Sequence, residues 1–459
     1  MRLTFALVLV AVLAACDGAD PAPPPSVDAP LAGWLRANVH ALDTAAPRDD
    51  VSDLRWLDGV VGDARVVGLG EATHGTREFF QIKDRVIGYL VGELGFDAVV
   101  FEGDLAPGAA IDAYVRGGAG EPEALVAGFG LWPWRTESVA DLVRGLRARS
   151  AAGGAARFFG ADVQYPFLQA DLVVDAVVEA EPDSADVVRA LMACVAAPYG
   201  GPFDARDAAA RTYPDRTASE RAVCRRDVAA AGAYLDRRRE VYDAALGPDR
   251  AALARRAAVA VSQGERLLAS LVPSEGDYFY LRDRAMADNV VWLLDHLGPG
   301  SRVAVWAHNV HVSRSVDDLP TMGEFLAADL GDAYRTLGFA FHRGSVTGVR
   351  DGRLGPVDVG AGPAGGFGAL FAEAGLPLFA LDLRRDLGGA AAPLAESRPF
   401  RQYGARVEAG PAGPARLADW FDAVVFVETS TATRLLPAPP GAAEAPGGVA
   451  NRWQPRTGP

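Results

Sequence analysis

Residues 65–75 read Arg-Val-Val-Gly-Leu-Gly-Glu-Ala-Thr-His-Gly, and this stretch decides the expected fold. A short apolar run bounded by glycine is typical of a buried strand, and this one leads directly into Glu71 and His74. In residues 77–94 the apolar side chains recur at three- and four-residue spacing, which predicts an amphipathic helix that ends at Gly95. A buried strand followed by such a helix indicates the repeating unit of an α/β protein.

The same alternation continues along the chain. Short apolar runs predict further strands at residues 96–101, 157–161, 302–306, 334–341, 376–383 and 423–427. We therefore expect an α/β fold with a mostly parallel sheet of seven or eight strands, flanked by helices on both faces. Residues 168–298 contain few β-branched runs and predict a mainly helical insertion, which divides the α/β domain into residues 31–167 and 299–436.

Length and composition limit the classes of protein. A chain of 459 residues exceeds one compact unit of about 150 residues, so a large domain with insertions or two to three domains is expected. Half the residues are hydrophobic, which supports a sizeable core. The net charge of −14 argues against a nucleic-acid partner and against binding to anionic lipid by charge alone. Lys83 is the only lysine of the chain.

The N-terminus has the pattern of an export signal. Arg2, the apolar run 3–13 and small residues before Cys16 predict a signal peptide over residues 1–15. The segment resembles a bacterial lipobox, which implies that Cys16 is lipidated and anchors the protein to the cell envelope at its periplasmic face. An ordinary signal peptide or a chance cysteine are the alternatives. Residues 16–30 are rich in proline and predict a tether, and residues 437–459 predict a disordered tail.

Two cysteines remain, Cys194 and Cys224, which are 30 positions apart. In an oxidising compartment they could close a disulfide. They could equally be two buried, unpaired thiols in a helical region. The sequence leaves both states open.

Ionisable side chains stand where four of the predicted strands end. The six residues are Glu71, His74, Glu102, Asp162, His308 and His311. Because the carboxyl ends of parallel strands meet at one ligand crevice, we expect these side chains to share a site. Taken singly, each has a simpler interpretation as a cap or an ion-pair partner, and Asp162 could cap a helix that begins near Pro166.

Several motifs together resemble one known family. They are residues 68–79 with Lys83, Arg85, Gly95, Phe96 and Glu102; Trp-Pro-Trp-Arg-Thr-Glu at 132–137; Gly-Ala-Asp-Val-Gln at 160–164; Arg282 and Asp283 with Met286 and Asn289; and Trp-Ala-His-Asn-Val-His at 306–311. This set closely resembles the signature of the erythromycin esterase family, and the resemblance spans roughly residues 54–427.

The resemblance implies a hydrolase whose substrate is an ester or a lactone, with macrolide antibiotics as one possibility. It implies that His74 is the general base toward water, that Glu71 orients it, and that Lys83 supplies the basic residue expected in the family. Glu102, His308 and His311 would line the same cleft, where one histidine could act as acid or hold the oxyanion. The residues expected to contact substrate are Trp132, Trp134, Asp162, Arg282 and Asn309.

Other mechanisms and functions compete with this hypothesis. No Gly-x-Ser-x-Gly motif is present, which disfavours a serine nucleophile. We expect no cofactor, although a divalent zinc, manganese or iron ion held by Glu71, His74, His308 and His311 is the alternative within the enzyme class. From a different class, the chain could be an envelope lipoprotein that binds haem or another ligand through His74 or His311 without turnover.

Overall fold

The computed structural model describes residues 29–154, 156–317, 319–408 and 412–438. The predicted signal peptide, the lipidated Cys16, nearly all of the tether and most of the predicted tail lie outside these residues. No helix among the described residues combines the length and hydropathy needed to cross a bilayer.

The main sheet has nine strands in the order β1-β8-β11-β6-β2-β5-β3-β4, with β7 paired to β6. The strands are β1 (His40–Ala41), β2 (Val66–Leu69), β3 (Ala98–Asp104), β4 (Arg157–Asp162), β5 (Val303–Trp306), β6 (Tyr334–Arg350), β7 (Arg353–Asp358), β8 (Leu378–Asp382) and β11 (Ala423–Ser430). Pairing is parallel from β11 through β4 and antiparallel for β1, β7 and β8. This confirms the expected α/β class with a mostly parallel sheet.

Two features of the sheet differ from the expectation of seven or eight strands. β6 continues past residue 341 to Arg350 and turns back into β7, a hairpin with few apolar side chains that the hydrophobic pattern did not indicate. β1 has only two residues, too few for a periodic signal. A separate ribbon pairs β9 (Arg398–Arg401) with β10 (Ala412–Ala415).

Alternation of side chains along the strands builds two apolar layers. Val66 packs into one buried cluster and Val67 into the other, because successive residues of a strand point to opposite faces. One layer includes helices α2 (Trp56–Val61), α3 (Arg77–Gly92) and α6 (Glu137–Ala151). The other includes α1 (Ala29–Asn38), α13 (Tyr278–Leu297), α15 (Met322–Leu330) and α16 (Phe367–Ala372). Helices therefore cover both faces of the sheet.

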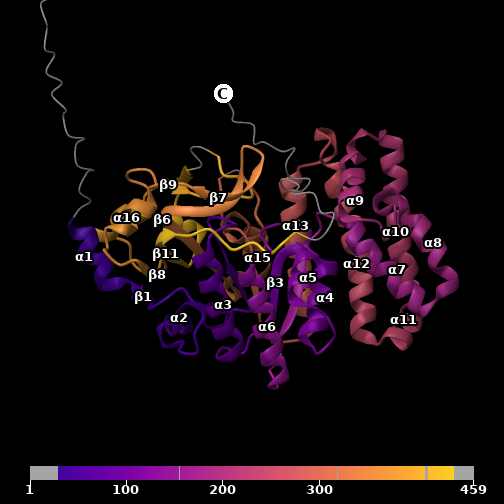
Figure 1. Ribbon diagram of the computed structural model, residues 1–459, viewed down its shortest axis with the longest axis horizontal. Coiled ribbons are helices and arrows are strands. Elements are labelled where there is room, and N and C mark those ends of the chain that lie inside the picture. Colours follow the sequence, from indigo (N-terminus) through magenta and orange to yellow (C-terminus); the bar gives the residue numbers. More distant parts are fainter. Residues whose placement is uncertain (1–28, 155, 318, 409–411, 439–459) are drawn as a thin grey trace, which may run out of the picture.

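The region between β4 and β5 is helical and packs its own buried cluster. Its helices, which lie together at one end of the molecule (Figure 1), are α7 (Pro166–Ala180), α8 (Ala185–Ala196), α9 (Phe203–Arg211), α10 (Ala218–Arg237), α11 (Arg239–Leu246) and α12 (Pro248–Ala269), followed by α13. Cys194 of α8 and Cys224 of α10 form a disulfide. The structure thus favours the disulfide over two free thiols.

The remaining helices are short and connect strands. They are α4 (Leu105–Val115), α5 (Pro122–Ala127), α14 (Asn309–Val312), α17 (Ala392–Ala395) and α18 (Leu417–Trp420). The neighbouring order β2-β5-β3-β4 places the carboxyl ends of four parallel strands side by side. The residues that follow these strands therefore meet at one edge of the sheet, where open parallel sheets form their ligand crevices.

Candidate active site

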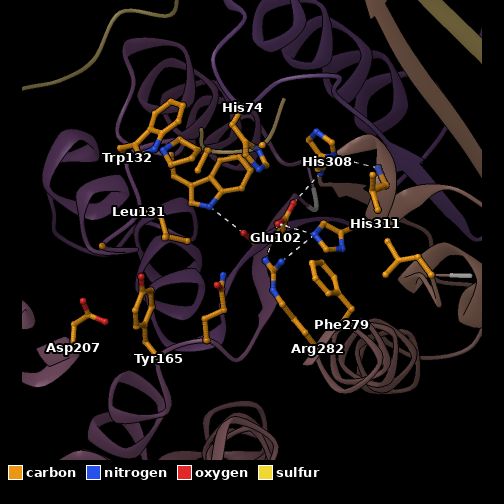
Figure 2. Close-up of a pocket in the computed structure, with 18 of the residues that line it drawn as sticks. His74, Glu102, Leu131, Trp132, Tyr165, Asp207, Phe279, Arg282, His308 and His311 are labelled. Atoms are coloured by element: carbon orange, nitrogen blue, oxygen red, sulfur yellow. Dashed lines mark hydrogen bonds and ion pairs between the residues drawn. The ribbon is translucent and has the colours of Figure 1, made fainter. Parts of the chain in front are cut away.

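A cavity of about 530 Å³ opens above the carboxyl ends of β2, β3 and β5. Its wall includes His74, Glu102, Arg282, His308 and His311, together with Trp132 and Trp134. Figure 2 shows the three histidines and Glu102 gathered at one side of this cavity. The structure thus brings together residues that are more than 230 positions apart in the sequence.

His74 and Glu71 form a hydrogen-bonded pair just after β2. Nδ1 of His74 lies 2.7 Å from Oε1 of Glu71. A carboxylate only accepts hydrogen bonds, so Nδ1 carries the proton and the lone pair of the ring belongs to Nε2. The His74 side chain is 13% exposed and lines the cavity, and its Nε2 has no hydrogen-bond partner within the described part of the chain. His74 therefore presents an unprotonated nitrogen to the cavity.

Glu71 is completely buried and has two further donors. Lys83 of α3 donates from Nζ to Oε2, which also accepts from Nε1 of Trp306 at 2.8 Å. Burial, opposed by the charge of Glu71, lowers the pKa of Lys83 to about 8. Because the Nζ atom also lies 4.0 Å from the centroid of a Trp306 ring, the ammonium is enclosed and does not line the cavity. Lys83 fixes Glu71, which in turn fixes His74.

Glu102 lies within β3, two residues before its end, rather than after the strand as the sequence suggested. Its Oε2 accepts a hydrogen bond from the backbone N–H of His308 at 2.8 Å, and its Oε1 accepts from Nη2 of Arg282 at 2.7 Å. Burial alone would raise the pKa of Glu102, but nearby His311 and Arg282 hold it well below its usual value. Glu102 is thus a buried carboxylate that ties β3 to the loop after β5.

His308 has both ring nitrogens engaged by the backbone. Nδ1 accepts from the N–H of Val310 at 3.2 Å, so Nε2 carries the proton and donates to the carbonyl of Tyr403 at 3.2 Å. Burial and the neighbouring His74 ring, whose centroid is 5.1 Å away, hold the pKa of His308 well below its usual value. His308 is therefore a neutral wall of the cavity that also caps α14.

Arg282 of α13 joins two carboxylates. Its Nη2 donates to Oδ2 of Asp162 at 2.6 Å as well as to Glu102. Asp162 is fully buried and also accepts from Gln164 at 2.7 Å, so it does not reach the cavity. It does not cap the helix near Pro166 either, since Tyr165 holds that position. Asp162 supports Arg282, which faces the cavity.

His311 lies between two carboxylates. Its Nδ1 is 2.8 Å from Oδ1 of Asp283 and its Nε2 is 3.2 Å from Oε1 of Glu102. Although burial opposes it, these two charges raise the pKa of His311 to about 10. The ring is therefore positively charged at neutral pH and donates from both nitrogens.

One contact conflicts with this charge. Nη1 of Arg282 lies 3.0 Å from Nε2 of His311, which is a hydrogen bond only when the ring is neutral. We favour the charged ring, because three buried carboxylates, those of Glu102, Asp162 and Asp283, have Arg282 and His311 as their only ion-pair partners in the described part of the chain. A single positive charge would leave two of them uncompensated in a region of low dielectric constant.

Asn309 differs from its expected role in substrate contact. Its side chain is fully buried, donates to the carbonyl of Phe339 at 2.8 Å and accepts from the N–H of the same residue at 3.0 Å. A Cβ atom at Gly70 would lie 2.2 Å from Oδ1 of Asn309, so only glycine permits this close approach. Asn309 fastens α14 against β2 and β6 and does not line the cavity.

Trp132 and Trp134 both line the cavity. Trp134 donates from Nε1 to the carbonyl of Glu102 at 3.0 Å, and its ring centroid lies 4.9 Å from that of Phe101. Nε1 of Trp132 is buried with no partner in the described residues. The two rings therefore form an apolar wall beside His74, one fixed by a hydrogen bond and one not.

Several residues of the site escaped the sequence prediction. Asp283 and Trp306 belong to quoted motifs but were given no role, and only their contacts with His311 and Glu71 reveal one. Asp207 and Arg211 of α9, together with Phe203, line the cavity from the helical insertion. No motif marks them, because the sequence predicts only a mainly helical insertion in this region and no site residues.

The residues considered as metal ligands do not fit a cation. Both oxygens of Glu71 are engaged, Oε1 by His74 and Oε2 by Lys83, which is itself a cation. Glu102, which was not among the proposed ligands, is paired with Arg282. Both nitrogens of His308 are bonded to the backbone. No group of three or more histidine, cysteine, aspartate or glutamate residues in the described ranges is arranged to hold a metal ion. We derive no catalytic step through a metal.

Comparison with known proteins places the chain among hydrolases. The family model described as erythromycin esterase matches residues 91–430, which include Glu102, Arg282, His308 and His311 but begin after His74. A putative hydrolase, YbfO, of Bacillus subtilis (strain 168) is 22% identical over 370 residues, which cover 76% of this chain and 80% of the relative. Erythromycin esterase type II of Escherichia coli is 25% identical over 330 residues, which cover 68% and 77%.

The fold also matches a solved structure. A crystal structure of a Bacillus cereus protein superposes with a TM-score of 0.76 and 24% identity, and covers 89% of this chain and 98% of the other. At this identity the likeness concerns the fold alone.

Proposed function

The chain belongs to the erythromycin esterase family, and we propose that it hydrolyses an ester or lactone by means of water that His74 activates. The family assignment supports a hydrolase. The observation that carries the finer proposal is the bond between His74 Nδ1 and Glu71 Oε1, which leaves Nε2 of His74 free at the cavity. An imidazole held in this tautomer can accept a proton from water at its free nitrogen.

In the proposed reaction, a water molecule transfers a proton to Nε2 of His74 while its oxygen attacks the carbonyl carbon of the substrate. Glu71 stabilises the imidazolium that forms, since its negative charge lies against Nδ1. The tetrahedral intermediate then expels the alkoxide, which takes the proton back from His74. The products are a carboxylic acid and an alcohol, and His74 is restored.

The developing oxyanion requires positive charge in the cavity. Arg282 and protonated His311 both line the cavity and are held there by Glu102, Asp162 and Asp283. Groups fixed before the reaction stabilise developing charge without further reorganisation. We propose that Arg282 stabilises the carbonyl oxygen, and that His311 adds positive charge without a hydrogen bond, because both of its N–H groups are engaged by carboxylates. Lys83 is enclosed behind Glu71, so we propose that it is a positioning residue.

The ion pairs of the two buried glutamates support catalysis without a metal. Glu71 and Glu102 already balance Lys83 and Arg282, so a divalent ion would have to displace buried ion pairs. The metal-dependent mechanism is therefore the weaker proposal. Binding of haem without turnover is also weaker, because the family assignment supports a hydrolase.

The experiment that tests the function is a screen of esters, lactones and macrolides for a mass increase of one water. The related enzyme of Escherichia coli bears the name erythromycin esterase type II, so a macrolide belongs in the panel. Hydrolysis of at least one compound, lost in His74→Ala, is the expected result. A panel in which nothing gains water would contradict the proposal.

We further propose that the protein is exported and held at the membrane through lipid on Cys16. The Cys194–Cys224 disulfide supports an oxidising compartment. Metabolic labelling with a fatty acid tests this proposal. The wild-type protein should incorporate the label, and Cys16→Ala should not.

A further inference from the structure

Two buried polar atoms in the wall of the cavity have no hydrogen-bond partner in the residues that the structure describes. They are Nε1 of Trp132 and Oδ1 of Asp207. Leaving such an atom unpaired is unfavourable, because it loses its hydrogen bonds to water and gains none in return. By contrast, both carboxylate oxygens of Glu102 in the same wall accept hydrogen bonds. The two unpaired atoms mark positions where a bound molecule can supply the missing partner.

Asp207 is held in place by its neighbour on α9. Nε and Nη2 of Arg211 donate to Oδ2 of Asp207 at 2.9 and 2.7 Å. The Asp207 side chain is only 7% exposed, so its second oxygen, Oδ1, is removed from water without compensation. This arrangement fixes the orientation of the carboxylate and leaves one acceptor unused.

The missing partner of Asp207 is a neutral hydrogen-bond donor rather than a cation. Arg211 already balances the carboxylate charge, and its guanidinium would repel a second positive group. A hydroxyl group satisfies the acceptor without adding charge. The surroundings are apolar, since Phe203 and Tyr165 line the same part of the wall with ring centroids 4.9 Å apart.

Asp207 and the proposed base come from different parts of the fold. Asp207 lies on the helical insertion, whereas His74 lies in the loop after β2 and Glu102 lies in β3, and all three line one cavity. Figure 2 shows Asp207 and Tyr165 on the opposite side of Leu131 from His74. A molecule that reaches both ends must therefore extend beyond the reacting ester group.

We propose that Asp207 is a substrate-binding residue that accepts a hydrogen bond from a hydroxyl group of the substrate, and that Nε1 of Trp132 donates to another oxygen of the same molecule. The inference rests on the proposed ester hydrolysis and narrows its substrate class. The substrate is a largely apolar ester or lactone that carries a hydroxyl group away from the bond that is cleaved.

The first test compares p-nitrophenyl esters of ω-hydroxyalkanoic acids, about six to twelve carbons long, with their ω-methoxy counterparts. The wild-type protein should prefer the hydroxyl ester by roughly tenfold in kcat/KM at the best chain length, equivalent to about 1.4 kcal/mol. Asp207→Asn should abolish the preference, because an amide N–H serves hydroxyl and ether oxygens alike. Asp215→Asn is the matched control, since Asp215 is an exposed aspartate outside the cavity.

A second variant and a binding measurement keep the test independent of turnover. Trp132→Phe keeps an aromatic side chain but replaces the indole, with its N–H, by a smaller phenyl ring, so it should weaken both esters equally and leave the hydroxyl preference intact. Calorimetry with 1,10-decanediol and its dimethyl ether needs no catalysis, and only the diol should lose affinity in Asp207→Asn. Thermal unfolding verifies that each variant is folded.

The outcomes separate this inference from the proposed function. Selective binding of the diol without hydrolysis of any ester would support the role of Asp207 and contradict esterase activity. Equal kcat/KM for both esters together with equal binding of diol and ether would overturn the role of Asp207 and leave hydrolysis standing.

Discussion

Nδ1 of His74 lies 2.7 Å from Oε1 of Glu71, so the ring is held with Nε2 toward the cavity. His74→Ala removes the proposed base, and kcat/KM should fall by a factor that corresponds to about 3 kcal/mol or more. The fold should persist, because His74 is partly exposed. His40→Ala is the control, since His40 stacks on Trp56 outside the cavity. Near-normal turnover of His74→Ala would show that another group is the base.

Lys83→Met should lower kcat while leaving KM nearly unchanged. Lys83 donates to Glu71 but does not line the cavity, so its loss disturbs the orientation of His74 and not the contacts with substrate. A decrease of roughly 10- to 100-fold is expected for loss of a group that supports a catalytic residue. Steady-state kinetics of both parameters provide the measurement.

The conservative variant distinguishes positioning from charge alone. Lys83→Arg retains the positive charge, but the larger guanidinium does not fit beside Trp306 and Phe80, since the lysine side chain is completely buried. It should not restore kcat. Full activity of this variant would mean that only the charge matters.

The sheet was predictable where strands and helices alternate with strong periodicity. The runs at 65–70 and 302–306 correspond to β2 and β5, and α3 matches the predicted helix closely. The hairpin of β6 and β7 was missed because its few buried apolar side chains, among them Val346 and Val357, are separated by glycine, polar and exposed residues. Hydrophobic periodicity indicates a strand only where several apolar residues recur at regular spacing, and isolated buried valines do not form such a pattern.

The site was predictable to the extent that topology determines it. Glu102 and His308 meet because β3 and β5 are parallel neighbours. Sequence order could not reveal that Asn309 faces Phe339 rather than the cavity, since that depends on the packing of α14. Nor could sequence order show that Asp207 lines the cavity, because the position of α9 beside the sheet depends on tertiary packing.

Dialysis against a chelator such as EDTA should leave activity unchanged. The oxygens of Glu71 and Glu102 already accept from Lys83 and Arg282, so a divalent ion bound by these carboxylates would have to displace buried ion pairs. Metal analysis of the dialysed protein should accompany the assay. Activity that disappears on chelation and returns with zinc or manganese would establish the metal-dependent mechanism instead.

His311 should make the free energy of unfolding depend on pH between about 6.5 and 8. Asp283 and Glu102 oppose the effect of burial and raise the pKa of His311 to about 10, above the value of 6.5 that an unfolded histidine has. The folded state therefore binds the extra proton in this range, and the stabilisation, complete below pH 6.5, decreases as pH rises toward 10. Between pH 6.5 and 8 the loss amounts to roughly 2 kcal/mol.

The measurement is denaturant unfolding of the wild-type protein and of His311→Gln at several pH values. Burial raises the pKa of Asp104 to about 8, so Asp104 titrates in the same range, but it is present in both proteins and cancels in their difference. The stability difference between the two proteins should shrink as pH rises, because only the wild type loses the contribution of His311. A difference that stays constant from pH 6.5 to 8 would mean that the ring is neutral and accepts a hydrogen bond from Arg282.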